Sequence, residues 1–323
     1  MSQPTRTAAV IYNPIKVELD ELKAAVEAEP ASAGWTVLWL PTSEDDPGQG
    51  PAKEALDSGA TLVIAAGGDG TVRAIAEVVR GSDAALSLLP SGTGNLLARN
   101  LDLTLDDTEH SLGTAFGGAD RAIDIAEIEI RRSDNSVDKH AFLVMAGAGL
   151  DAKIMSNTDD ELKKKVGWLA YAQALSRVLR DKSGLRLRYK LDSHRDRSTR
   201  AEAIIVGNCG SLPANILLMP EAVVDDGLLD VVVLRPKSFG GWMAVIFKVF
   251  WENGVVKRTK LGRRMGEVSS DSIAIRQAKV ITARLSKAEE IQLDGDPFGE
   301  AVGFRVKVDA GGLTIKVPSE STD

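Results

Sequence analysis

The chain has 323 residues, a length that suggests about two domains. Acidic residues outnumber basic ones by 46 to 39, and the resulting net charge of −7 argues against a general nucleic-acid binder, which usually has a basic excess. The single cysteine, Cys209, excludes an internal disulfide, and three widely separated histidines offer no zinc-ligand spacing, so we expect a protein of the reducing cytoplasm.

Strand-like and helix-like segments alternate in the first third of the chain. Apolar patterning predicts strands at 8–12, 35–40, 61–66 and 85–89, with helices at 17–28, 52–57 and 72–80 between them. This rhythm predicts a parallel sheet covered by helices, that is, an α/β domain. Such sheets bind ligands at the carboxyl ends of their strands.

The rhythm changes after residue 121. A long helix is predicted at 161–180 and an amphipathic one at 239–253. The predicted strands are 123–131, 140–146, 185–191, 201–206, 229–234, 272–275, 279–283, 302–308 and 313–317. We therefore expect an α/β domain over residues 1–121 and a mainly antiparallel β domain over 122–318. The alternative that the last strand returns to the first domain is left open. We expect residues 319–323 to form a tail.

A glycine-rich turn follows the third predicted strand, at Gly67-Gly68-Asp69-Gly70-Thr71, and a helix begins directly after it. Glycines let the backbone approach phosphate oxygens, and a helix N-terminus favours an anion. Asp69 would hold Mg²⁺ between two phosphates or orient an attacking hydroxyl. Taken alone, the pattern is equally compatible with a tight turn that carries an Asp cap.

A second loop of the same character follows the next predicted strand, at Pro90-Ser91-Gly92-Thr93-Gly94-Asn95. Two such loops on consecutive strand ends would face one crevice, which favours the phosphate-binding interpretation. Asn13, after the first strand, and Thr42, after the second, are placed to line the same crevice. No Walker A sequence is present, since no Gly-Lys-Ser/Thr occurs.

In their order along the chain, these segments resemble the diacylglycerol kinase catalytic family, which includes sphingosine kinases and bacterial lipid kinases. Its first-strand Asn-Pro resembles Asn13-Pro14, and its two glycine loops resemble residues 67–71 and 90–95. Its DGLLD and DGEP stretches resemble residues 226–230 and 294–297. The resemblance implies an α/β domain like that of NAD kinases and phosphofructokinases, followed by a β-sandwich. It also implies ATP bound between the two domains and Mg²⁺ assisting transfer of the γ-phosphoryl group.

The resemblance also implies roles for individual residues. Asp296 would be the general base, beside Asp69, and Asp294 would have a supporting or metal role. Val223, Asp226 and Leu228 would form a Mg²⁺ site from one carboxylate and two backbone carbonyls, although Asp-Gly at 226–227 fits a β-turn equally well. ATP would contact Asn13, Pro14, Ile15, Lys16, Val17, Thr42, Gly67, Gly68, Asp69, Gly70, Thr71, Val72, Arg73 and Thr93.

Two departures from the family pattern stand out. Ile15-Lys16-Val17 occurs where the family often has Ser-Gly, and Asp296 occurs where it has Glu, one methylene longer. The sequence therefore leaves open a nucleotide-binding regulator that has lost catalysis. It also leaves open the acceptor of a kinase: diacylglycerol, which we expect, a sphingoid base, phosphatidylglycerol or a soluble alcohol.

An apolar segment at 239–251, followed by five basic residues between Lys257 and Arg264, suits an anionic membrane surface, though a core-packing helix explains its spacing as well. The segment falls far short of the roughly 20 apolar residues that a spanning helix needs. We expect a cytoplasmic enzyme that contacts the inner membrane face peripherally and does not bind nucleic acid. A homodimer is left open.

Overall fold

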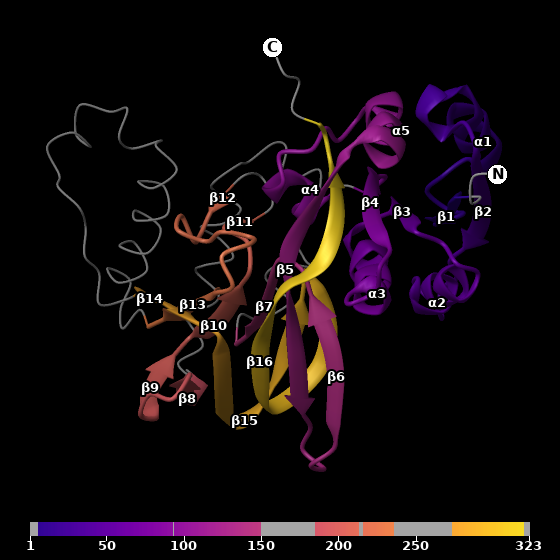
Figure 1. Ribbon diagram of the computed structural model, residues 1–323. Coiled ribbons are helices and arrows are strands. Elements are labelled where there is room, and N and C mark those ends of the chain that lie inside the picture. The colour runs from indigo at the N-terminus through magenta and orange to yellow at the C-terminus, as the bar shows by residue number, and fades with distance from the viewer. Residues whose placement is uncertain (1–5, 93, 150–184, 213–215, 236–272, 320–323) are drawn as a thin grey trace, which may run out of the picture.

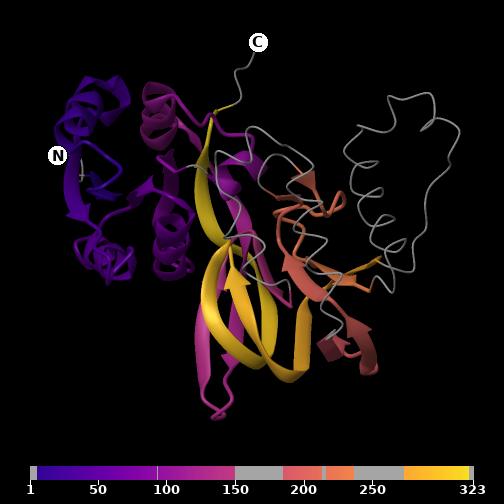
Figure 2. The ribbon, with the colours of Figure 1, turned by 180° about the vertical axis from the view of Figure 1, so that it is seen from behind.

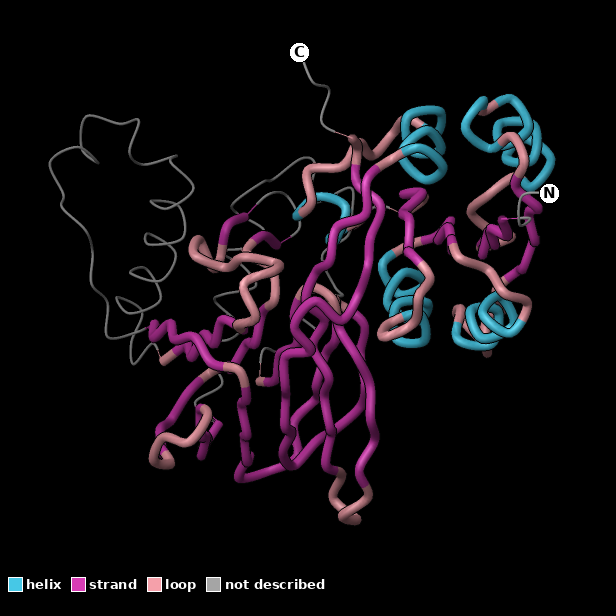
Figure 3. The backbone as a smooth tube through the Cα atoms, in the orientation of Figure 1, coloured by secondary structure: helices cyan, strands magenta, loops and turns pink. Residues whose placement is uncertain are grey.

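The computed structural model describes residues 6–92, 94–149, 185–212, 216–235 and 273–319. Its helices gather over the first part of the chain, while the rest of the described chain is built almost wholly from strands (Figure 3). The predicted order of an α/β part followed by a mainly antiparallel β part is confirmed.

The α/β part contains a parallel sheet in the order β4-β3-β1-β2. Its elements are β1 (Arg6–Tyr12), α1 (Leu19–Ala28), η1 (Pro30–Ser32), β2 (Trp35–Pro41), α2 (Gln49–Asp57), β3 (Leu62–Gly67), α3 (Asp69–Val79), β4 (Ala85–Pro90), α4 (Leu96–Asn100) and α5 (Thr108–Gly117). No helix was predicted where α4 and α5 lie, because short glycine-flanked segments carry little periodicity.

Helices cover both faces of this sheet, and for that reason its central strand has no polar side. All six residues of β3 are buried. Leu62 and Ile64 pack with residues of α1 and α5 on one face, while Val63 and Ala65 pack with residues of α2 and α3 on the other. The alternation follows from the two-residue period of a strand.

The second part consists of strands, which are β5 (Ala119–Arg131), β6 (Val137–Phe142), β7 (Met145–Ala148), β8 (Leu185–Leu191), β9 (Arg197–Ala201), β10 (Ala203–Gly207), β11 (Ser211–Leu212), β12 (Ile216–Leu217), β13 (Leu229–Leu234), β14 (Ile273–Ala278), β15 (Val280–Leu293) and β16 (Asp296–Val317). β16 pairs with β5 and β15, and at Ile315 it also pairs with Leu86 of β4 in parallel. One sheet therefore runs through both parts (Figures 1 and 2). The domain boundary at 121/122 stays a prediction.

Four predicted strands are divided or merged in the structure. Residues 140–146 form parts of two strands, β6 and β7, which are separated at Leu143 and Val144. Residues 201–206 are likewise divided between β9 and β10. Residues 302–308 and 313–317 belong to one strand, β16, whose pairing with β5 shifts register between Asp309 and Leu313. Among the helices of the described residues, none is long and apolar enough to cross a membrane.

Candidate active site

The loops that carry the predicted phosphate site begin at the carboxyl ends of the parallel strands. Tyr12 at the end of β1 is level with Pro41 of β2 and with Ala66 of β3, and Gly67 is level with Pro90 of β4. Backbone hydrogen bonds continue this alignment into the loops, because the N–H of Asn13 donates to Ala66 and that of Thr42 donates to Tyr12. The strand ends therefore bring four loops together.

Residues 13–17 form a turn at the end of β1. The Asn13 side-chain oxygen accepts the Ile15 N–H at 2.9 Å, and the Asn13 carbonyl accepts the N–H groups of Lys16 and Val17 at 3.0 Å. The turn brings Lys16 to the next loop, since a Cβ atom added to Gly68 would lie 2.9 Å from Lys16 Nζ. The ammonium group therefore lies beside a glycine backbone, where it can attract an anion.

The loop after β3 leads directly into α3, whose 11 residues begin at Asp69. Gly68, the residue before the helix, is extended and has no side chain to cap the first N–H groups. These donors and the positive end of the helix dipole therefore remain available to an anion at this end of α3.

The loop after β4 is organised by Asn95, which adopts the left-handed conformation with φ 48°. Its side-chain amide donates to the Gly92 carbonyl at 2.8 Å, and its side-chain oxygen accepts the Gly92 N–H at 3.3 Å. The two glycine loops touch, because a Cβ atom on Gly92 would lie 2.9 Å from the Gly68 Cα. Arg99 closes the loop by donating from Nε to the Gly94 carbonyl at 2.8 Å.

Asp69 lies between these loops. Its Oδ1 accepts the N–H of Leu96 at 2.5 Å, and a Cβ atom on Gly94 would lie only 2.3 Å from its Oδ2. Burial raises the pKa of the Asp69 carboxyl, and the negative charge of Asp296 raises it further, against the lowering effect of the Leu96 hydrogen bond. The two carboxylates are thus close enough to interact electrostatically.

Asp296 begins β16 and reaches the first glycine loop from the β-rich part. A Cβ atom on Gly70 would lie 2.7 Å from Asp296 Oδ2, so this carboxylate lies against the first turn of α3. Asp294, two residues earlier, points elsewhere and is only 5% exposed. Its two oxygens accept the N–H groups of Leu143, Val144 and Met145 at 2.8–2.9 Å.

These three bonds explain why residues 140–146 are not one strand. The N–H groups of Leu143 and Val144 turn toward a carboxylate instead of a neighbouring strand, and pairing resumes at Met145. Both oxygens of Asp294 therefore accept backbone N–H groups, which ties the turn before Asp296 to the break between β6 and β7.

Arg73, on α3, is 6% exposed and also faces the Asp296 turn. Its guanidinium lies 4.5 Å from the ring centroid of Phe298 and 3.7 Å from the Glu77 carboxylate. Its Nε and one terminal nitrogen have no hydrogen-bond partner within the described parts of the chain. Phe298 in turn contacts His140 edge to face, so α3, β6 and β16 meet here.

The remaining predicted ATP-contact residues differ in their exposure to solvent. Ile15 is 93% exposed at the rim, whereas Thr42, Thr71 and Val72 are buried. Thr93 lies outside the described residues. So do the predicted helices at 161–180 and 239–253 and the basic residues between Lys257 and Arg264.

The predicted metal residues lie on a turn before β13. Asp226 is exposed, and its Oδ1 accepts the N–H of Leu228 at 2.9 Å, while Val223 is 46% exposed. Gly227 is fixed by buried Asp124, whose Oδ2 accepts its N–H at 2.7 Å. Nowhere in the described ranges do three or more His, Cys, Asp or Glu side chains form a metal-binding group. The metal site at Val223, Asp226 and Leu228 stays a prediction.

Three residues that shape the site were not predicted from the sequence: Asn95, Arg99 and Asp124. The left-handed conformation of Asn95 could have been predicted, because Asn is among the non-glycine residues that most readily adopt it. Arg99 and Asp124 had no such signal, since their partners are backbone groups brought near by the fold.

Two family models together match most of this chain. The model of the diacylglycerol kinase catalytic domain matches residues 7–128, and that of the YegS C-terminal NAD kinase beta sandwich-like domain matches residues 144–315. A Pseudomonas fluorescens protein named "Probable lipid kinase YegS-like" is 30% identical over 98% of this chain and 97% of its own length.

Two solved structures show a similar fold. A diacylglycerol kinase structure from Bacillus anthracis is 18% identical, with a TM-score of 0.66 over 97% of this chain and 96% of that one. A yeast NADH kinase structure is 12% identical, with a TM-score of 0.53 over 99% of this chain and 85% of that one.

Proposed function

Because the chain belongs to the diacylglycerol kinase catalytic family of lipid kinases, we propose that it transfers the γ-phosphoryl group of ATP to the hydroxyl of a lipid, with diacylglycerol the favoured acceptor. The observation that carries this proposal is the meeting of Asp69 and Asp296, from the two parts of the fold, beside two glycine loops. Phosphoryl transfer depends mainly on positioning and charge stabilisation, which such an arrangement can supply.

The glycine positions support a phosphate-binding role. Added Cβ atoms at Gly68, Gly70, Gly92 and Gly94 would each come within 3 Å of Lys16, Asp296, Gly68 and Asp69, respectively. These close approaches are to protein groups, so glycine is required for the loops to pack this tightly. The resulting bare backbone suits contact with phosphate oxygens. With the α3 N-terminus and the Lys16 ammonium, these loops form a cradle suited to the triphosphate of ATP.

The two carboxylates would have different tasks. A lipid hydroxyl is a poor nucleophile at neutral pH, and Asp296 would accept its proton as the bond to phosphorus forms. Asp69 is fixed by the Leu96 N–H, and burial opposes its ionisation, so an ionised Asp69 favours a nearby cation.

The donor chemistry of the crevice fits Mg²⁺, which prefers oxygen ligands, and Asp69 would hold it. When bound, Mg²⁺ would neutralise charge on the phosphates. For the turn before β13, our proposal retains a second Mg²⁺ at Asp226 with the carbonyls of Val223 and Leu228. The exposed Asp226 carboxylate supports it, since its Oδ2 is not used in the Leu228 hydrogen bond.

The acceptor can be identified with an array of lipids and γ-³²P-labelled ATP. We expect label on diacylglycerol and none with the Asp69→Asn variant. Label on a sphingoid base or phosphatidylglycerol would keep the lipid kinase and change the acceptor. Nucleotide binding without labelling of any lipid would contradict the proposal and favour a regulator, and labelling of soluble alcohols alone would exclude a lipid substrate.

A further inference from the structure

A group of arginines lies on the outer face of the β-rich part, which we call the arginine face: Arg186, Arg188, Arg200 and Arg284. Arg186 and Arg188 are on β8, where leucines and Tyr189 alternate inward and basic residues alternate outward. Arg200 is on β9 and Arg284 is on β15, the strands that flank β8. All four side chains are exposed.

The pairing register places these like charges directly opposite one another. Arg186 is opposite Arg200, and Arg188 is opposite Arg284. Like charges at opposed positions on antiparallel strands destabilise the sheet, so four arginines here are unfavourable without an anion.

The described residues supply only part of that negative charge. Arg188 donates to the exposed carboxylate of Asp196 at 2.8 Å. Within the described ranges, Arg186, Arg200 and Arg284 have no ion pair, although the whole chain carries more acidic than basic residues. The local excess of positive charge therefore runs against the net charge of −7.

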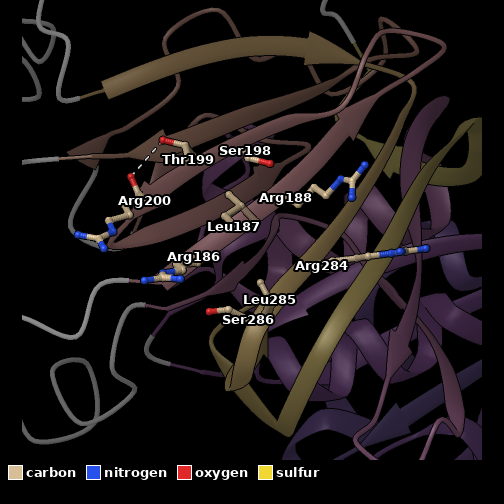
Figure 4. Close-up of a pocket in the computed structure, with 9 residues that line it drawn as sticks. All are labelled: Arg186, Leu187, Arg188, Ser198, Thr199, Arg200, Arg284, Leu285 and Ser286. Atoms are coloured by element: carbon tan, nitrogen blue, oxygen red, sulfur yellow. Dashed lines mark hydrogen bonds between the residues drawn. The ribbon is translucent and has the colours of Figure 1, made fainter.

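These arginines line a recess of about 480 Å³. Figure 4 shows the side chains around it. The recess is lined by the four guanidinium-bearing residues together with Ser198, Thr199, Ser286, Leu187 and Leu285. A guanidinium presents a planar fork of donors that matches the oxygens of a phosphate group, and hydroxyls can add single hydrogen bonds. The chemistry of the recess is thus that of a phosphate-binding surface.

We propose that the arginine face docks this protein onto the phosphates of an anionic bilayer. The proposal rests on the proposed function, since a lipid kinase must reach its substrate at a membrane. Charge complementarity favours a surface: the arginines are exposed and spread over three neighbouring strands rather than gathered around one enclosed ligand. They also lie at the end of the molecule away from α1–α3 (Figures 1 and 2), so they are separate from the nucleotide crevice.

One strand connects the docking surface to the catalytic turn. β15 carries Arg284 near its start and ends at Leu293, immediately before Asp294 and Asp296. A bilayer that contacts the arginine face therefore has a fixed relation to the carboxylate that faces the acceptor.

The test is sedimentation of the full chain with vesicles of phosphatidylcholine, either pure or containing phosphatidylglycerol, at low and high salt. The variant is Arg186→Glu/Arg200→Glu, in which both members of an opposed pair change, so like charges still face each other and folding is little altered. The matched control is Lys53→Glu/Arg131→Glu, with the same change in net charge at exposed residues on α2 and β5.

We expect the parent and the control to bind anionic vesicles in a salt-sensitive manner and pure phosphatidylcholine weakly. The double variant should bind anionic vesicles at least about 30-fold more weakly, because it loses two basic residues, each worth about 1 kcal/mol near an anionic surface, and gains two acidic ones. Equal binding by the double variant and the parent would overturn the proposal. A second result would also overturn it. In that result, inorganic phosphate changes the melting temperature of the parent but not of the double variant, and neither protein binds vesicles.

A second readout separates this proposal from the proposed function. Phosphorylation of a short-chain diacylglycerol dispersed in detergent should be the same in the parent and the double variant. Vesicle binding that depends on the arginine face, without phosphorylation of any lipid, would support the docking surface and contradict the kinase. Phosphorylation of lipid without vesicle binding would support the kinase and contradict the docking surface.

Discussion

The two carboxylates of the crevice are held there in different ways. Asp69 is the first residue of α3, shortly after β3, and its hydrogen-bond partner Leu96 is only 27 residues further along the chain. Asp296 follows Asp294, whose partners Leu143 to Met145 are 149–151 residues away. The first position is thus set by a short local motif, and the second depends on the completed β-rich part. Changes at Asp69 should therefore act mainly on chemistry, with a small gain in stability from the loss of a buried charge, whereas changes beside Asp296 should weaken the fold.

The largest expected effect is that of Asp69→Asn. We expect lipid phosphorylation to fall by about 10³-fold or more, because the charge that holds a cation or orients the hydroxyl is lost. The fold should be retained, since Asn can still accept the Leu96 N–H. Asp134→Asn, in the exposed turn between β5 and β6, is the matched control and should have parental activity. Near-normal turnover of Asp69→Asn would remove the basis of the phosphate crevice.

The next effect is that of Asp296→Asn, which removes the proposed base. We expect turnover to fall by about 10²–10⁴-fold with unchanged ATP affinity, measured as steady-state kinetics and nucleotide binding. Asp296→Glu should retain activity, as a carboxylate is kept. If Asp296→Asn turns over normally and Asp294→Asn is inactive, the roles of the two acids are reversed.

Asp294→Ala should instead weaken the fold. It removes the acceptor of three backbone N–H groups in a buried turn, and we expect the free energy of unfolding to drop by about 3 kcal/mol in urea titrations. Asp296→Ala is the control and should change this free energy little. A stable Asp294→Ala variant would show that the break between β6 and β7 does not depend on this carboxylate.

The smallest effect concerns the pH dependence of stability. Burial raises the pKa of Asp69 above 3.8, so its ionisation weakens the fold, and this cost is present above the folded-state pKa and absent below about 3.8. Asp69→Asn is neutral at every pH and should melt a few degrees higher than the parent at pH 7. The difference should shrink as the pH falls toward 4. A difference in melting temperature that does not vary with pH would contradict this account of Asp69.

The α/β part was predicted more closely than the β-rich part, because its elements are set by local sequence, whereas those of the β-rich part depend on distant partners. The strands and helices around β3 and α3 follow from local apolar periodicity, and the glycine loops from their position at strand ends. The break at Leu143 could not be predicted, because it is made by Asp294 from the other end of the chain. The placement of Asp69 and Asp296 at one site was predicted only through the resemblance to the family, since nothing near either residue specifies the other.

In the proposed mechanism, Asp69 and Asp296 act together on one phosphoryl group. The most direct test is to measure kcat/KM on diacylglycerol in mixed micelles for the parent, the variants Asp69→Asn and Asp296→Asn, and the double variant. If the two carboxylates act as a unit, the double variant should be about as impaired as the more impaired single variant, because either loss already disables the shared step. Losses that multiply would show instead that the two carboxylates act independently, and would contradict the account.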